Sequence, residues 1–275
     1  MKKFKWSNLY LLFVFIFLYI PIAYLIVYSF SAGNSMSGFT GFSLKHFYTL
    51  FSDTRLIIIL LNTFMLAFLS SLIATLIGIF GAMNIYYMKK RTTRMMMLSA
   101  NNILMVSPDV IIGASFLIFF TGLGSLFPGF GLGFTTVLLS HIAFSIPIVV
   151  LMVLPKLREM NDSMVWAAYD LGANNWQILN RIILPYLTPG IIAGYFMAFT
   201  YSLDDFAVTF FVTGNGFTTL SVEIYSRARQ GISLEINALS ALVFLFSLIL
   251  VVGYYFISKD NMPRKNKKER KSLNR

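Results

Sequence analysis

The sequence predicts an all-α membrane protein with six transmembrane helices. Of its 275 residues, 57% are hydrophobic and only 12% are charged, a composition that excludes an ordinary soluble domain. A bilayer core about 30 Å thick needs roughly 20 mostly apolar residues for each helical crossing. Six windows meet this requirement, near residues 8–30, 57–88, 98–120, 134–155, 187–213 and 236–257.

The first four windows each show a feature that affects how the helix sits in the membrane. The first follows the basic stretch MKKFK and is longer than the roughly 7–15 apolar residues of a signal peptide, which predicts an uncleaved anchor. The second, 57–88, is long enough to tilt or to extend past the bilayer. Pro108 and Pro147, in the third and fourth, are expected to kink their helices. His141 is expected to be a packed or hydrogen-bonded helix residue rather than a proton relay.

The last two windows lead to the domain boundary. Gly190 and Gly194 have the G-x-x-x-G spacing that predicts close packing between helices. After the sixth window we expect the transmembrane domain, 1–258, to give way to a basic tail, 259–275. The chain has no cysteine, which excludes disulfides and thiolate chemistry, and its two histidines lie in no metal-ligand cluster.

Basic residues predict that both termini are cytoplasmic in a multi-pass protein of the cell membrane. Lys and Arg in short flanking segments are retained on the cytoplasmic side. With an inside N-terminus, 18 of the 22 basic residues lie inside, and the other four, Lys45, Arg55, Arg227 and Arg229, lie outside. The net charge of +11 is therefore chiefly an orientation signal, with attraction to membrane lipid as a second effect and no nucleic-acid partner expected.

Residues 156–186 form a predicted cytoplasmic loop that is far longer than a connection between neighbouring spans requires. Apolar residues recur near helical spacing before and after Gly172, which predicts two short helices hinged at that glycine. Pro185 is expected to mark the return to the membrane. The loop either presents an apolar face to a partner outside the bilayer or lies on the membrane surface as an amphipathic hairpin.

At this loop the sequence resembles the permease subunits of ABC importers. Their signature, E-A-A-x-x-x-G followed after nine intervening residues by I-x-L-P, is matched by Ala167, Ala168, Gly172, Ile182, Leu184 and Pro185. Trp166 replaces the leading Glu, so any ion pair made through that Glu does not carry over. The resemblance implies the six-helix type I importer arrangement, with this loop as the coupling helix that binds an ATPase subunit and Gly172 as its hinge.

The resemblance also implies partners: a second homologous permease, two ATPase subunits and an extracytoplasmic binding protein. The chain contains no G-x-x-x-x-G-K-[ST] phosphate loop and no nucleophile elbow. We therefore expect no enzyme activity and no bound cofactor here, with ATP and Mg used by the separate ATPase subunits. A secondary transporter would need its own coupling-ion site and usually internal repeats, and a passive channel a selectivity ring, none of which is evident in the sequence.

Three further stretches resemble the C-type permease of spermidine/putrescine importers. They are SPDVIIGASF at 107–116, SLDDFAVTFFVTG at 202–214 and TLSVEIYSRARQGISLEINALS at 219–240. Together with the loop motif, the similarity covers about residues 57–257 and implies polyamine import by alternating access through an extracytoplasmic polyamine-binding protein. Related iron, sulfate and thiosulfate permeases share much of this framework, so ferric iron or an inorganic anion is the alternative substrate.

Acidic residues in the fifth window favour a cationic substrate. At Asp204 and Asp205 an ionisable side chain costs roughly 2.5–3.5 kcal/mol in the membrane and tends to face the bundle interior or a water-filled cavity. Neighbouring helix positions differ by about 100°, so only one carboxylate faces a narrow pathway, unless the helix is broken there. Tyr201 shares their face, and a carboxylate beside an aromatic ring suits an ammonium group. The alternatives are neutralisation by a partner subunit and a place near the outer interface.

Two further groups are candidates for contact with substrate or partner. Asp109 is expected to line the pathway, with an N-cap of a helix that resumes after Pro108 as its alternative. The outer loop 214–235 predicts a short surface helix, on which Glu223, Arg227 and Arg229 are expected to contact the binding protein. The alternative for that loop is a solvated charged segment.

Overall fold

The computed structural model describes residues 6–34, 36, 38–127, 129–230 and 234–260. In these ranges the regular structure is helical, apart from one isolated antiparallel bridge between Ser31 and Phe42, which confirms the all-α prediction. Most of the predicted basic tail, from residue 261 on, lies outside the described residues, as do the N-terminal lysines. The chain divides into two compact units, one of residues 55–226 and one that joins residues 1–54 to 227–275.

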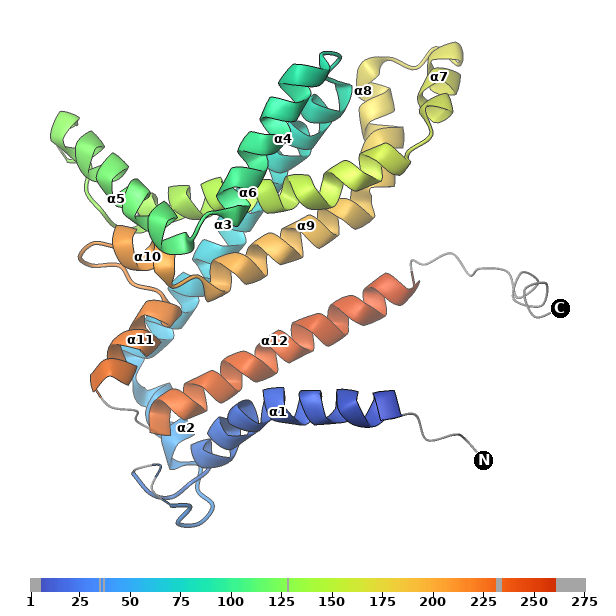
Figure 1. Ribbon diagram of the computed structural model, residues 1–275. Coiled ribbons are helices and arrows are strands. Elements are labelled where there is room, and N and C mark those ends of the chain that lie inside the picture. Colours follow the sequence, from blue (N-terminus) through green and yellow to red (C-terminus); the bar gives the residue numbers. More distant parts are fainter. Residues whose placement is uncertain (1–5, 35, 37, 128, 231–233, 261–275) are drawn as a thin grey trace, which may run out of the picture. The chain divides into compact units, whose positions relative to one another are not determined.

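The unit built from both ends of the chain contains α1 (Trp6–Ser29), α2 (Lys45–Ser52) and α12 (Leu234–Asp260). α1 and α12 pack side by side and run antiparallel (Figure 1). At the start of α2, the Nε2 atom of buried His46 lies 2.9 Å from the carbonyl oxygen of Gly33, which belongs to the connection between α1 and α2. This contact ties the start of α2 to the loop that follows α1.

The larger unit contains the remaining helices. They are α3 (Thr54–Tyr87), α4 (Arg91–Val106), α5 (Asp109–Leu126), α6 (Phe134–Glu159), α7 (Asp162–Asp170), α8 (Asn175–Ile178), the π-helix η1 (Leu179–Ile183), α9 (Leu184–Asp204), α10 (Ala207–Val212) and α11 (Leu220–Gln230). The first residue of α3 and the last four residues of α11, from Arg227 on, belong to the other unit. α6 and α9 run antiparallel along most of their length, and α4 packs on α6 (Figure 1). The short helix α10 contacts both α5 and α6.

Glycines allow α3 and α9 to approach α6 closely. A Cβ on Gly194 would lie 3.3 Å from the Cα of Val149, and one on Gly78 would lie 2.6 Å from the Cγ1 of the same residue. A Cβ on Gly190 would lie 3.0 Å from the carbonyl oxygen of Met152. The predicted close packing through G-x-x-x-G is confirmed, because a larger residue at these positions would separate the helix backbones.

Five helical stretches of the described residues are long and apolar enough to cross a bilayer. They are Leu9–Ser29, Thr54–Tyr87, Asp109–Leu126, Phe134–Glu159 and Asn175–Asp204. A shorter apolar stretch, Leu234–Ile249, falls in the sixth predicted window. The chain is therefore a multi-pass membrane protein.

Two predicted windows are interrupted in the structure. The third, 98–120, crosses a break between α4 and α5, where Ser107 is extended with φ −69° and ψ 140°. Proline lacks an N–H and disfavours helical backbone in the residue before it, so Pro108 causes this break and the membrane-length helix begins at Asp109. The fifth window, 187–213, is one helix only as far as Asp204, after which Asp205 is extended with φ −62° and ψ 123°.

The predicted loop 156–186 contains α7, a turn at Gly172, α8 and η1, and its helix continues from η1 into α9. Gly172 has φ +81°, a left-handed conformation that favours glycine, and its N–H donates to the carbonyl of Tyr169 over 2.9 Å. The N–H of Ala173 donates to the carbonyl of Ala168 over 3.0 Å, which completes a Schellman motif at the end of α7. Pro185 lies in the first turn of α9, and helix runs without a break from Asn175 through η1 into α9.

Candidate functional site

The break between α9 and α10 gives the two neighbouring aspartates opposite environments. Asp204 is the last residue of α9 and is exposed. In the part of the chain that the structure describes, its carboxylate makes no hydrogen bond or ion pair. The side chain of Asp205 is only 6% exposed and points into the unit. Of the predicted alternatives for this pair, the structure shows a broken helix.

Asp205 holds the start of α10. Its Oδ2 accepts hydrogen bonds from the backbone N–H of Thr209, over 2.8 Å, and from the hydroxyl of the same residue, over 2.7 Å. Its Oδ1 accepts a longer bond of 3.3 Å from the N–H of Val208. The Ser221 hydroxyl donates to the Asp205 carbonyl over 2.6 Å. This carboxylate therefore satisfies N–H groups at a helix start, which would otherwise lack partners.

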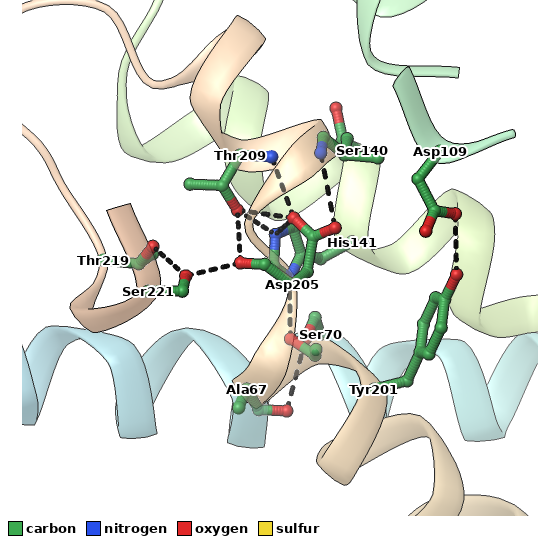
Figure 2. A network of polar contacts seen from close by, with 12 residues as sticks. Ala67, Ser70, Asp109, Ser140, His141, Tyr201, Asp205, Thr209, Thr219 and Ser221 are labelled. Atoms are coloured by element: carbon green, nitrogen blue, oxygen red, sulfur yellow. Dashed lines mark hydrogen bonds and ion pairs between the residues drawn. The ribbon is translucent and has the colours of Figure 1, made fainter. Parts of the chain in front are cut away.

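His141 of α6 lies at the centre of this network (Figure 2). The ring is fully buried, with Nδ1 2.7 Å from the Ser202 hydroxyl and Nε2 2.9 Å from that of Thr209. Nε2 also lies 3.5 Å from Oδ2 of Asp205. Ser202 in turn lies 2.9 Å from the hydroxyl of Ser70 on α3. The prediction that His141 is a packed, hydrogen-bonded residue is confirmed.

Tyr201 and Asp109 meet beside this network (Figure 2). The Tyr201 hydroxyl donates to Oδ1 of Asp109 over 2.9 Å, and its ring meets that of Phe144 edge to face at a centroid distance of 5.1 Å. Both Tyr201 and Asp109 are exposed. Asp109 is the first residue of α5, and its predicted alternative as N-cap is wrong because Pro108 occupies that position.

α5 and α10 begin at neighbouring breaks and pack against each other. A Cβ on Gly113 of α5 would lie 2.7 Å from Phe211 and 3.1 Å from the carbonyl oxygen of Ala207, so the two helices are in close contact. Helix N-termini attract negative charge. Here both carry a carboxylate of the chain, Asp109 in the first turn of α5 and Asp205 bonded to the first turn of α10. This arrangement disfavours a bound anion and leaves Asp204 available for a cation.

The residues of the loop motif lie on α7, in the turn at Gly172, in η1 and at the start of α9. Ala168 is buried and packs in one apolar cluster with Ile178 and Ile183. Ala167 and Pro185 are exposed, while Ile182 and Leu184 are half-buried. Large side chains are exposed around the turn: Trp166 at 66%, Leu171 at 89% and Trp176 at 69%. The loop therefore presents an aromatic and aliphatic surface at the end of α6 and α9.

The three predicted docking residues lie on α11. Glu223 is buried, and its carboxylate pairs with Arg55 over 3.3 Å. Arg227 pairs with Asp53 over 3.2 Å, and Arg229 is exposed in the last turn. Charged side chains of this helix are thus engaged within the chain, and Arg229 is the most outward of the three predicted residues.

Sequence reasoning missed the hydroxyl residues that hold the break. Ser202 and Thr209 lie three residues before and four residues after Asp205, so each follows helical spacing from it. The indication available in the sequence was a hydroxyl residue at helical spacing on either side of a carboxylate within an apolar window. The link to His141 joins residues far apart in sequence, and only the fold reveals it.

The chain is similar to known transport proteins. A family model described as binding-protein-dependent transport system inner membrane component matches residues 74–259. The spermidine/putrescine transport system permease protein PotC of Escherichia coli (strain K12) is 36% identical over 90% of this chain and 91% of its own length. The corresponding protein of Haemophilus influenzae is 33% identical over 95% and 99%, and the putrescine transport system permease protein PotI of Escherichia coli (strain K12) is 31% identical over 94% and 93%.

Solved structures share the fold at low sequence identity. A chain of a bacterial ABC transporter involved in the import of the acidic polysaccharide alginate has a TM-score of 0.74 at 19% identity, covering 94% of this chain and 96% of that one. A chain of the MetNI methionine ABC transporter in inward-facing conformations has a TM-score of 0.58 at 17% identity, covering 74% and 95%. At these identities the likeness concerns the helical fold alone.

Proposed function

The chain belongs to the family of binding-protein-dependent transport system inner membrane components, and from this premise we propose that it is the permease subunit of an ATP-driven polyamine importer. Relatives named for spermidine and putrescine transport match more than nine-tenths of their own length, which supports the substrate class. The subunit moves spermidine or putrescine into the cell by alternating access.

The acidic surface at the two helix breaks carries the proposal. Asp204 is exposed with no other charge to neutralise it among the described residues, and Asp109 and Tyr201 form an exposed carboxylate and ring pair close to the same break. An ammonium group gains both charge pairing and cation–π attraction from such a lining. Because Asp109 and Asp205 already occupy the N-termini of α5 and α10, sulfate or another anion would meet repulsion there.

We propose that the loop 156–186 couples this subunit to ATP hydrolysis. ATP and Mg bind in two separate ATPase subunits, and the chain itself is no enzyme. The exposed surface around Trp166, Leu171 and Trp176 supports this role, since large apolar side chains outside a membrane span favour a protein partner. With Trp166 in place of the Glu of the signature, the contact at that position is apolar rather than ionic.

The remaining partners and the topology follow from the same proposal. A second homologous permease completes the pathway, and the outer face around Arg229 on α11 receives an extracytoplasmic polyamine-binding protein. The excess of basic residues in the predicted inside segments supports cytoplasmic termini and a sixth span in α12. The basic tail, 259–275, then lies in the cytoplasm.

Helix continuity supports the mechanism. α8, η1 and α9 form one helical stretch from Asn175 to Asp204, so the loop and the acidic surface lie at opposite ends of a single element. When ATP binding brings the ATPase subunits together, displacement of α7 and α8 reaches Asp204 through α9.

Spermidine uptake by the complete complex in proteoliposomes tests the function. We expect Asp204→Asn to lower ATP-dependent uptake at low substrate concentration by roughly tenfold or more, as loss of a charged contact does. The control Asp204→Glu keeps the negative charge at the same exposed position and should retain most of the uptake that Asp204→Asn loses. Excess sulfate should leave uptake unchanged.

The outcomes separate the candidate substrates. Strong competition by ferric iron, with no spermidine accumulation by an ATP-hydrolysing wild-type complex, would replace the polyamine with the metal ion. Normal spermidine uptake by Asp204→Asn would keep the permease and remove the acidic surface from the pathway.

A further inference from the structure

His141 makes contacts on both sides of the break between α9 and α10. Its Nδ1 meets Ser202, which lies in the last turn of α9, and its Nε2 meets Thr209, which lies in the first turn of α10. The ring belongs to a third helix, α6, and is fully buried. One side chain therefore bridges two helix ends that are joined by only two non-helical residues, Asp205 and Phe206.

The hydrogen bonds define which ring nitrogen of His141 donates and which one accepts. The Thr209 hydroxyl donates its proton to Oδ2 of Asp205, so it accepts from Nε2 of His141. In the neutral ring, Nδ1 then accepts the hydroxyl proton of Ser202. Ser70 of α3 supports that hydroxyl from the other side. Each ring nitrogen thus has its own partner, and neither bond can be lost without leaving a buried polar group unpaired.

The segment between these contacts is the one that contains Asp204. Ser202 is held on its N-terminal side, and Asp205 is held on its C-terminal side through both its carboxylate and its carbonyl. Asp204 lies between the held residues and is exposed on the face of α9 that includes Tyr201, three residues earlier. Its backbone position is fixed by neighbours while its carboxylate remains open.

We propose that His141 is a positioning residue for substrate selection: by bridging Ser202 and Thr209 across the break, it fixes the place of the Asp204 carboxylate relative to Tyr201 and Asp109. This inference rests on the proposed function. Polyamines differ in the number and spacing of their ammonium groups. A carboxylate in a fixed place distinguishes these spacings, whereas a mobile one attracts any polyamine through charge alone.

Two substitutions remove one contact each. The amide of Asn reaches the position of Nδ1 in a His ring, and that of Gln reaches the position of Nε2, so His141→Asn keeps a partner for Ser202 and His141→Gln keeps one for Thr209. The control is Ser140→Ala. Ser140 is equally buried in the same helix, but its hydroxyl donates to the carbonyl of Thr136 within α6 and does not reach the break.

The measurement is KM and kcat for ATP-dependent uptake of spermidine and of putrescine by the complete complex in proteoliposomes. We expect both His141 variants to change the ratio of the KM values for spermidine and putrescine by roughly tenfold, the effect of one lost buried hydrogen bond. The kcat values should stay within about twofold of wild type. Ser140→Ala should keep the wild-type ratio. In an Asp204→Asn background, His141→Asn should add no further change, because the residue acts through that carboxylate.

Each other result overturns the inference. A wild-type KM ratio in either single-contact variant means that bridging is not required, and a lower kcat at an unchanged ratio means that the ring only supports the fold. If the His141 variants fail to assemble, Ser202→Ala decides. It removes one hydroxyl, leaves the ring and Asp205 in place, and must change the ratio as His141→Gln would.

Failure of the proposed function would look different. A wild-type complex that hydrolyses ATP but accumulates neither polyamine removes the substrate class itself. Polyamine uptake that depends on Asp204 but keeps its KM ratio in the His141 variants removes only the positioning role.

Discussion

At the scale of single residues, two identical side chains next to each other perform different tasks. The bonds of Asp205 to Thr209 and Val208 make it part of the framework, while Asp204 is exposed, and we propose that it meets an incoming ligand. The helix ends between them, so Asp205 leaves α9 and bonds to the first turn of α10, whereas Asp204 stays at the exposed end of α9. Stability and substrate binding should therefore respond to different members of the pair.

Alanine substitutions at the pair test this division of roles. Asp205→Ala removes an acceptor of several hydrogen bonds from a buried site, and we expect a loss of about 2–3 kcal/mol of stability. Asp204→Ala should leave stability unchanged. Thermal unfolding of the purified complex, followed by the loss of monodisperse protein, measures both. Equal effects of the two substitutions would contradict the assignment.

At the scale of elements, the joint between α8 and α9 is a short turn of π-helix, η1. In η1 the N–H of Leu184 donates to the carbonyl of Leu179, five residues back, so the helix is locally wider than an α-helix. Pro185 follows directly and has no N–H to continue the α pattern. The wide turn therefore sets the rotation of the turn at Gly172 relative to α9.

Deletion of Asn180 tests this joint. Removing one residue lets the π turn become an α turn and rotates α7 and α8 by about 100° relative to α9. We expect ATP hydrolysis by the complex to continue while spermidine uptake falls at least about tenfold. Asn180→Ala, which keeps the residue count at this exposed position, should transport normally. Coupled transport by the deletion variant would show that the rotation is unimportant.

The elements also show how far the sequence alone could lead. Apolar windows, the spacing of Gly190 and Gly194 and the turn at Gly172 predicted most helices, the packing of α9 on α6 and the end of α7 correctly. Pro108 marked one break by its missing N–H. No proline or glycine marks the break after Asp204. The break is held by contacts from His141 and Ser221, which belong to other helices. Local sequence carries no trace of such contacts, and the positions of the site residues required the fold.

At the scale of the whole molecule, one continuous helical stretch connects two surfaces of different chemistry. The turn around Leu171 is apolar and aromatic, whereas the surface around Asp204 is acidic. In the other unit, α1 is exposed along most of its length, and Ser29 at its end is buried. We expect its exposed apolar face to contact lipid or the proposed second permease.

The absence of native cysteine makes the predicted orientation easy to test. Ser52→Cys, at the end of α2, should react with a membrane-impermeant maleimide added to intact cells, because it precedes the second span on the predicted outer side. Thr92→Cys, next to the basic residues at the start of α4, should react only after permeabilisation. Both positions are exposed, so the opposite pattern would reverse the topology.

The contact at Val149 has a mechanical consequence. Gly194 of α9 and Gly78 of α3 both pack against this one residue of α6, so three helices meet at a single valine with no side chain from α9 or α3 at the contact. Leu184 and Asp204 lie ten residues before and after Gly194, about 15 Å along α9 in each direction. Such a crossing acts as the fulcrum of a lever with two equal arms. We expect a push on the Leu184 end of α9, where we propose that the ATPase binds, to become an opposite movement of similar size at the acidic end.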